Sequence, residues 1–112
     1  MAAFGTVLTT SEVGVDAVVS PTPGATVSIT AGSGNLFKWT AGENETINIT
    51  SGQTAGRVIT LMITNDALAR TITLGTGIVS IGVVIGTALK TAVVVLQSDS
   101  TNFYELSRTL GL

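Results

Sequence analysis

The 112-residue chain has no cysteine and no histidine, and only twelve of its residues are charged: five Lys or Arg and seven Asp or Glu. Without cysteine there is no disulfide framework, no thiolate zinc site and no thiol nucleophile. Without histidine, acid–base catalysis would depend on paired carboxylates, and the acidic residues are scattered along the chain. A charged fraction of 11%, against about 25% in an ordinary domain, also argues against an enzyme.

The few acidic residues do not form a recognisable site. The nearest pair, Glu43 and Glu45, stands in a predicted turn, and we interpret it as a solvated loop. Asp66 and Asp99 lie in turn-forming segments and are expected to bond their own backbone. The segment 98–102 carries several side-chain oxygens but one carboxylate, fewer than a calcium loop needs. We therefore expect no catalytic residue, no metal site and no cofactor.

Positive charge is as sparse as negative charge, and the net charge is −2. Binding to nucleic acid needs clustered basic residues, so we expect no nucleic-acid partner. The N-terminus has neither the basic region nor the apolar run of a secretory signal, so we expect synthesis and folding in the cytoplasm.

One stretch raises the question of a membrane helix, because residues 78–96 contain a single charge, Lys90. A lysine in the middle of a membrane helix costs about 2.5–3.5 kcal/mol. The stretch is also dense in Val and Ile and is interrupted by turn-like and polar residues at 86–91. We expect two buried strands there and no membrane partner.

Apolar and polar residues alternate with a period of two along most of the chain, which predicts half-buried strands. The short segments recur at spacings near ten residues and are separated by Gly, Asn, Asp and Ser. We predict an all-β fold: a jelly-roll-like or immunoglobulin-like β-sandwich of about eight short antiparallel strands. No internal repeat is visible. The expected strands lie at 25–30, 36–40, 46–50, 57–64, 70–74, 92–97 and 102–108, with another beginning at Ile78.

Two further expectations follow from the pattern. The strands at 57–64 and 70–74 are joined by a short segment that begins with Asn65 and Asp66, and they are expected to form a hairpin. The sequence Pro-Thr-Pro-Gly at 21–24 predicts a stiff turn. It divides the chain into an N-terminal arm or first strand over residues 1–20 and a β-sandwich domain over residues 21–112.

The five aromatic residues include two informative pairs. Phe37 and Trp39 are two apart, so they share one face of a strand. Phe103 and Tyr104 are adjacent and point to opposite faces, which predicts one core residue and one surface residue. A sugar-binding platform built on Trp39 or Tyr104 is an alternative interpretation, because exposed aromatic residues are favoured contact residues.

The closing part of the chain resembles the small β-domains of structural proteins of tailed bacteriophages. The likeness lies in Thr-Ala-Val-Val-Val at 91–95 and in the segment 98–108, Ser-Asp-Ser-Thr-Asn-Phe-Tyr-Glu-Leu-Ser-Arg. The segments 57–61 and 70–74 are similar to the central hairpin of the same family, so the likeness covers residues 36–108. Ser100 stands where such turns often carry glycine.

The resemblance implies a virion structural protein without catalytic residues. In that family such domains commonly form trimers, either as decoration (cement) proteins on the capsid or as parts of tail fibres. We expect a homotrimer that binds the major capsid protein and stabilises the shell, assembled in the host cytoplasm and located on the capsid surface. The alternative is a receptor- or glycan-binding module of a tail fibre or spike. The residues expected to contact the capsid or another subunit are Ala2, Ala3, Phe4, Val7, Leu8, Val13 and Val15.

Overall fold

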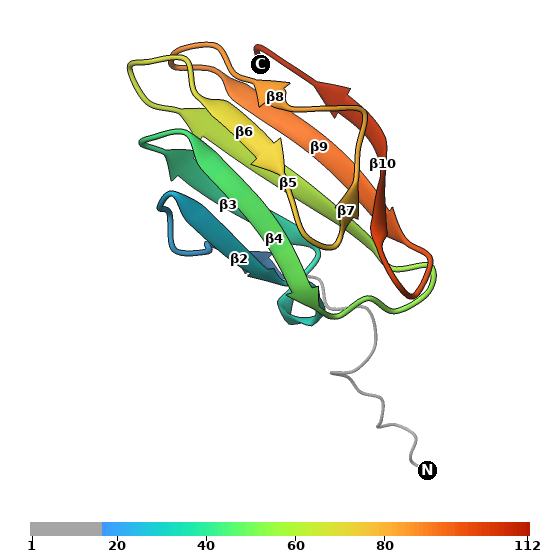
Figure 1. The fold of residues 1–112 in the computed structure, drawn as a ribbon. Coiled ribbons are helices and arrows are strands. Elements are labelled where there is room, and N and C mark those ends of the chain that lie inside the picture. The colour runs from blue at the N-terminus through green and yellow to red at the C-terminus, as the bar shows by residue number, and fades with distance from the viewer. Residues whose placement is uncertain (1–16) are drawn as a thin grey trace.

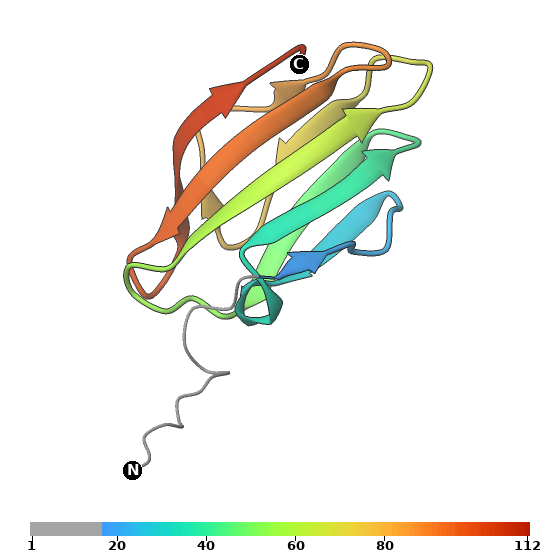
Figure 2. The same ribbon diagram turned by 180° about the vertical axis from the view of Figure 1, so that it is seen from behind.

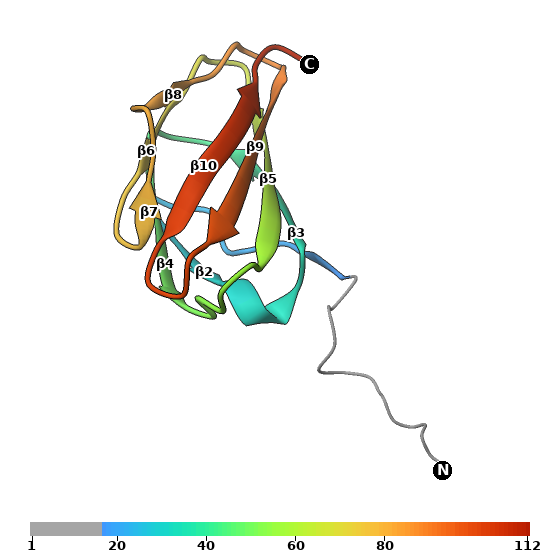
Figure 3. The same cartoon turned by 90° about the vertical axis from the view of Figure 1, so that its right-hand side faces the viewer.

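The computed structural model describes residues 17–112, which form two β-sheets that face each other around one core (Figures 1 and 2). Figure 3 shows the two layers from the side. A short 3-10 turn, η1 (Ala31–Ser33), follows the second strand. The strands are β1 (Val18–Val19), β2 (Thr26–Thr30), β3 (Leu36–Ala41), β4 (Glu45–Ser51), β5 (Val58–Asn65), β6 (Thr71–Leu74), β7 (Ile78–Val79), β8 (Val84–Ile85), β9 (Thr91–Ser98) and β10 (Phe103–Thr109).

The chain alternates between the two sheets as it winds. The six-stranded sheet has the order β1-β3-β5-β9-β10-β7, and the four-stranded sheet has the order β2-β4-β6-β8. The strands β1, β3 and β5 are parallel to one another, and so are β2, β4 and β6. This is the winding of a parallel β-solenoid. The long strands β9 and β10 then extend the larger sheet by antiparallel pairing, and β7 pairs parallel with β10 at its edge.

The all-β prediction is confirmed, with two sheets, but the predicted antiparallel pairing holds for only part of the fold. Five of the eight strand pairings are parallel. The predicted hairpin of 57–64 with 70–74 is wrong, because β5 lies in one sheet and β6 in the other. A period-two pattern determines which side chains face the core, but it contains no information on which strand lies alongside.

The core is built from rows of inward side chains that stack across neighbouring strands. In the four-stranded sheet Val27 pairs with Ile47, and Ile47 with Leu74. In the six-stranded sheet Phe37 pairs with Leu61. The stacking reveals a weak repeat that the sequence analysis missed: Thr-Val-Ser-Ile-Thr in β2 lies beside Thr-Ile-Asn-Ile in β4.

Asn65 is a buried polar residue, 2% exposed, at the end of β5. Its Oδ1 accepts a hydrogen bond from the amide of Arg70 (3.1 Å), and its Nδ2 donates to the carbonyl of Lys90 (3.3 Å). A Cβ at Gly86 would overlap the side-chain amide of Asn65, so glycine is required there. These contacts hold the β5–β6 connection, where the chain passes from one sheet to the other, against the start of β9.

The sparsely charged stretch at 78–96 contains β7, β8 and most of β9. No helix within residues 17–112 is long and apolar enough to cross a membrane. At the other end, Val18 and Val19 form β1, and residues 1–16 lie outside the described part of the chain. The predicted division between an N-terminal arm and the domain from residue 21 therefore stays a prediction.

Candidate interaction surface

All seven residues that the sequence analysis proposed as capsid or subunit contacts lie outside the described residues. They are Ala2, Ala3, Phe4, Val7, Leu8, Val13 and Val15. Their role as contacts stays a prediction. The surface considered below is formed by other residues, all within the described part.

Several exposed apolar residues lie on β7, β8, the connection between them, β10 and the residues after it. The strands β7, β8 and β10 form the side of the molecule that faces the viewer in Figure 3. The most exposed is Ile81, at 82%. It lies in the connection between β7 and β8. We call this side of the molecule the apolar flank. Its members are Val79, Ile81, Val83 and Ile85 from β7, β8 and their connection, and Leu106, Leu110 and Leu112 from β10 and the C-terminal residues.

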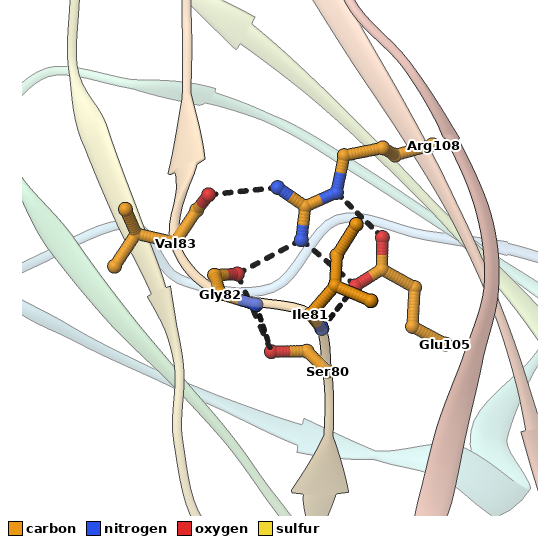
Figure 4. A network of polar contacts seen from close by, with 6 residues as sticks. All are labelled: Ser80, Ile81, Gly82, Val83, Glu105 and Arg108. Atoms are coloured by element: carbon orange, nitrogen blue, oxygen red, sulfur yellow. Dashed lines mark hydrogen bonds and ion pairs between the residues drawn. The ribbon is translucent and has the colours of Figure 1, made fainter.

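An arginine on β10 joins the two parts of the flank (Figure 4). The guanidinium of Arg108 donates to both carboxylate oxygens of Glu105, at 2.6 and 2.8 Å. It also donates to the carbonyls of Val83 (2.7 Å) and Gly82 (2.8 Å). The amide of Ile81 donates to Glu105 in turn (3.4 Å). The Arg108–Glu105 pair thus holds the β7–β8 connection against β10.

The ion pair is well shielded, because the side chains of Arg108 and Glu105 are 15% and 3% exposed. Hydrogen bonding to Arg108 is the main cause that lowers the pKa of Glu105 below its ordinary value, although burial opposes it. The stability that this carboxylate contributes is therefore present above the ordinary pKa of a glutamate. It is lost as the pH falls through the lowered pKa.

The prediction of a solvated loop holds for Glu43, which is exposed, but not for Glu45, which is 2% exposed. Its Oε1 accepts a hydrogen bond from the indole Nε1 of Trp39 at 2.8 Å, and its Oε2 one from the amide of Gly24 at 3.4 Å. Burial is the largest influence on its pKa, which is raised. Glu45 therefore ties a core aromatic residue to the turn before β2. The interpretation of this residue as solvated is wrong.

The two turn aspartates behave as predicted. Asp66 accepts a hydrogen bond from the amide of Leu68 (3.1 Å) and forms an ion pair with Arg70 (2.7 Å). Asp99 accepts from the amides of Thr101 and Asn102, each at 2.9 Å. These bonds lower the pKa of Asp99. Both residues stabilise local turns.

The aromatic predictions are confirmed where they concern faces of strands. Phe37 and Trp39 both point into the core, at 1% and 5% exposure. Phe103 is fully buried and Tyr104 is 42% exposed. Trp39 is thus too deeply buried to serve as a sugar-binding platform. Tyr104 keeps that interpretation open.

Within residues 17–112, no group of three or more His, Cys, Asp or Glu side chains is placed to hold a metal ion. No family model matches the chain, and no curated protein matches it.

The sequence analysis did not identify the apolar flank, although a signal was present. Residues 78–85 read Ile-Val-Ser-Ile-Gly-Val-Val-Ile, where apolar residues do not alternate with polar ones. Such a run predicts a buried strand. The structure places Ile78 and Val84 inward, while Val79, Ile81 and Val83 are exposed. The run therefore has apolar side chains on both faces.

Proposed function

We propose that the protein is a virion structural protein that forms trimers and decorates a bacteriophage capsid, stabilising its shell. The observation that carries this proposal is the apolar flank, because exposed apolar side chains on neighbouring elements are surface that another protein can cover. The resemblance of residues 36–108 to small β-domains of tailed-bacteriophage structural proteins supports the choice of assembly.

The mechanism would be mechanical. Burial of apolar surface releases about 25 cal/mol per Å², so contacts along the flank can join subunits without charge chemistry. Decoration subunits bound across neighbouring capsid proteins would oppose their separation under the pressure of packaged DNA. The major capsid protein would be the partner, and the capsid surface in the virion the location.

The finer fold assignment is part of this proposal. A jelly-roll-like or immunoglobulin-like sandwich has antiparallel sheets. The parallel stacking of β1, β3 and β5 and of β2, β4 and β6 favours a short parallel β-solenoid instead. We propose that β9 and β10 close the open end of this solenoid.

The test is binding to undecorated capsids. Purified protein is mixed with capsids that lack decoration, and co-sedimentation and heat resistance of the particles are measured. Saturable binding with increased heat resistance is the expected result. The absence of binding and of any gain in heat resistance would overturn the capsid assignment.

A second candidate function is a receptor- or glycan-binding module of a tail fibre or spike. The exposed ring of Tyr104 favours it, because sugars stack on accessible aromatic rings. Glycan-array binding by the purified protein that is lost in Tyr104→Ala, while Tyr104→Phe retains it, would make this the preferred function.

A further inference from the structure

One edge strand of the two sheets is unprotected. Within residues 17–112 four strands lie at sheet edges, and three of them, β1, β7 and β8, have two residues each. Very short strands, proline and charged side chains are the usual means by which edges avoid pairing with other chains. The fourth edge strand, β2, has five residues and contains neither proline nor a charged residue (Figure 1). It therefore has none of these protections.

The backbone groups on the open side of β2 follow from its pairing. The amide of Thr46 donates to the carbonyl of Ala25 (2.9 Å), so the backbone groups of Ala25 face β4. Because those of successive strand residues point to opposite sides, the N–H and C=O groups of Thr26 and Ser28 face away from β4. The strand pairs with β4 and with no other strand among residues 17–112. Its open side can therefore accept a further strand.

The sequence of β2 suits pairing with a copy of itself. Its residues read Thr-Val-Ser-Ile-Thr, which alternates hydroxyl and aliphatic side chains identically in both directions. An antiparallel copy centred on Ser28 places Val27 opposite Ile29, and both of these face the core. It places Thr26 opposite Thr30, and both of these are exposed. Apolar residues thus meet apolar residues, and each face of the sheet keeps its character across the junction.

We propose that β2 pairs with β2 of a second copy of this chain, antiparallel and in the register centred on Ser28. Because Ser28 faces the open side, it exchanges both backbone hydrogen bonds with Ser28 of the second copy. By the same alternation Thr26 pairs with Thr30. The carbonyl of Thr30 also accepts from the hydroxyl of Ser33 (2.7 Å) and has a second lone pair for the new bond. Opposed β-branched residues favour this register.

The position of β2 decides how this contact relates to the rest of the surface. The strand carries no charge, so two copies meet there without repulsion between like charges. A contact through one strand is small, and small interfaces are weak. We therefore expect it at high protein concentration, without an increase in the native mass of the dilute protein. Since β2 and β8 lie at opposite edges of the four-stranded sheet, the apolar flank stays accessible. The pairing does not depend on the function proposed above.

Disulfide cross-linking tests the pairing, because the chain has no cysteine and one introduced thiol reports one contact. The Cα atoms of a hydrogen-bonded antiparallel pair lie about 5.5 Å apart, within the range of roughly 4.4–6.8 Å that a disulfide spans. Under mild oxidation Ser28→Cys should therefore form a linked dimer about tenfold faster than Thr73→Cys. Thr73 is the matched control: it is exposed on the outer face of the same sheet but lies on β6, between β4 and β8. Equal rates for the two variants would overturn the proposal.

The register is tested by mixing Thr26→Cys and Thr30→Cys in equal amounts. Because Thr26 lies opposite Thr30, the mixed dimer should exceed the two symmetric dimers taken together. Random collision gives as much mixed dimer as symmetric dimer. Equal amounts would therefore overturn the proposed register.

Amide hydrogen exchange of the unmodified chain, followed by NMR, distinguishes a second copy from a cover supplied by the same chain. The amide of Ser28 should exchange freely in dilute protein and become protected as the concentration rises. The amide of Val27 faces β4 and should stay protected throughout, which shows that the domain remains folded. Protection of Ser28 at every concentration would overturn the proposal, because the edge would then be covered within one chain. Free exchange at every concentration would also overturn it.

Discussion

At the scale of single residues, the turn between β9 and β10 contains a backbone conformation that suits glycine better than the residue present. Ser100 has a φ of 90°, where a Cβ is disfavoured. Its amide donates to Oγ of Ser98 (3.1 Å), a bond that does not need the Ser100 side chain. The turn therefore retains its hydrogen bond when the side chain is removed.

We predict that Ser100→Gly stabilises the protein by about 0.5–1 kcal/mol, because it relieves the positive φ. The measurement is the free energy of unfolding in urea. Ser100→Ala is the control: it keeps the Cβ and should give no gain. A loss of stability in the glycine variant would mean that the serine hydroxyl contributes more than the strained backbone costs.

The second residue-scale prediction concerns Glu45, whose pKa is raised by burial. A carboxyl with a raised pKa in the folded state contributes most to stability below its unfolded pKa, and this contribution is lost as the pH rises through the folded pKa. Glu45→Gln keeps an acceptor for Trp39 and removes the titration. Its stability relative to the unmodified chain should therefore increase with pH across that window. A constant difference between the two chains from acid to neutral pH would contradict the raised pKa.

At the scale of elements, the connection between β7 and β8 depends on an arginine from another strand. Each of β7 and β8 has two residues, too few for a stable sheet edge. The bonds from Arg108 to the carbonyls of Gly82 and Val83 supply the order that these short strands lack. The shape of the apolar flank thus depends on one ion pair.

We predict that Arg108→Gln destabilises the protein by about 2 kcal/mol, because it leaves the shielded carboxylate of Glu105 without its cation. Exchange of the amides in 80–83 should also accelerate. Arg70→Gln is the matched control. Its partner Asp66 is more exposed (34%, against 3% for Glu105), so the loss should be smaller. Equal losses in both variants would show that shielding does not distinguish the two ion pairs.

At the scale of the whole molecule, the apolar flank predicts how copies associate. Ile81→Asp places a charge at the most exposed apolar position and should change the stability of the isolated subunit by less than about 0.5 kcal/mol. Native mass should fall from that of the proposed trimer to that of the monomer. Thr54→Asp, at an exposed position of the β4–β5 connection, is the control and should retain the oligomer. An oligomer that survives Ile81→Asp would place the subunit interface elsewhere.

The alternation of side chains along each strand was determined by the sequence alone. The bounds of β2 (Thr26–Thr30) and β3 (Leu36–Ala41) differ from the expected segments by one residue, and Phe37 and Trp39 face the core as predicted. Such features follow from local geometry, because neighbouring strand residues point to opposite faces. The turn bonds of Asp66 and Asp99 are local for the same reason.

The tertiary structure decided which strands pair. It also decided which isolated polar residues are buried and which apolar residues are exposed. Asn65 and Asp66 favour a turn, but only long-range contacts determine whether the chain returns in the same sheet or crosses to the other, as β6 does. Glu45 is buried because Trp39 and Gly24 come to it across the fold. The connection that carries Ile81 is likewise held by a distant residue, because the guanidinium of Arg108 donates to the carbonyl of Gly82, 26 positions earlier in the chain. A single sequence determines the alternation of side chains and the local turns. The contacts between residues far apart in the chain are determined by how the strands pack.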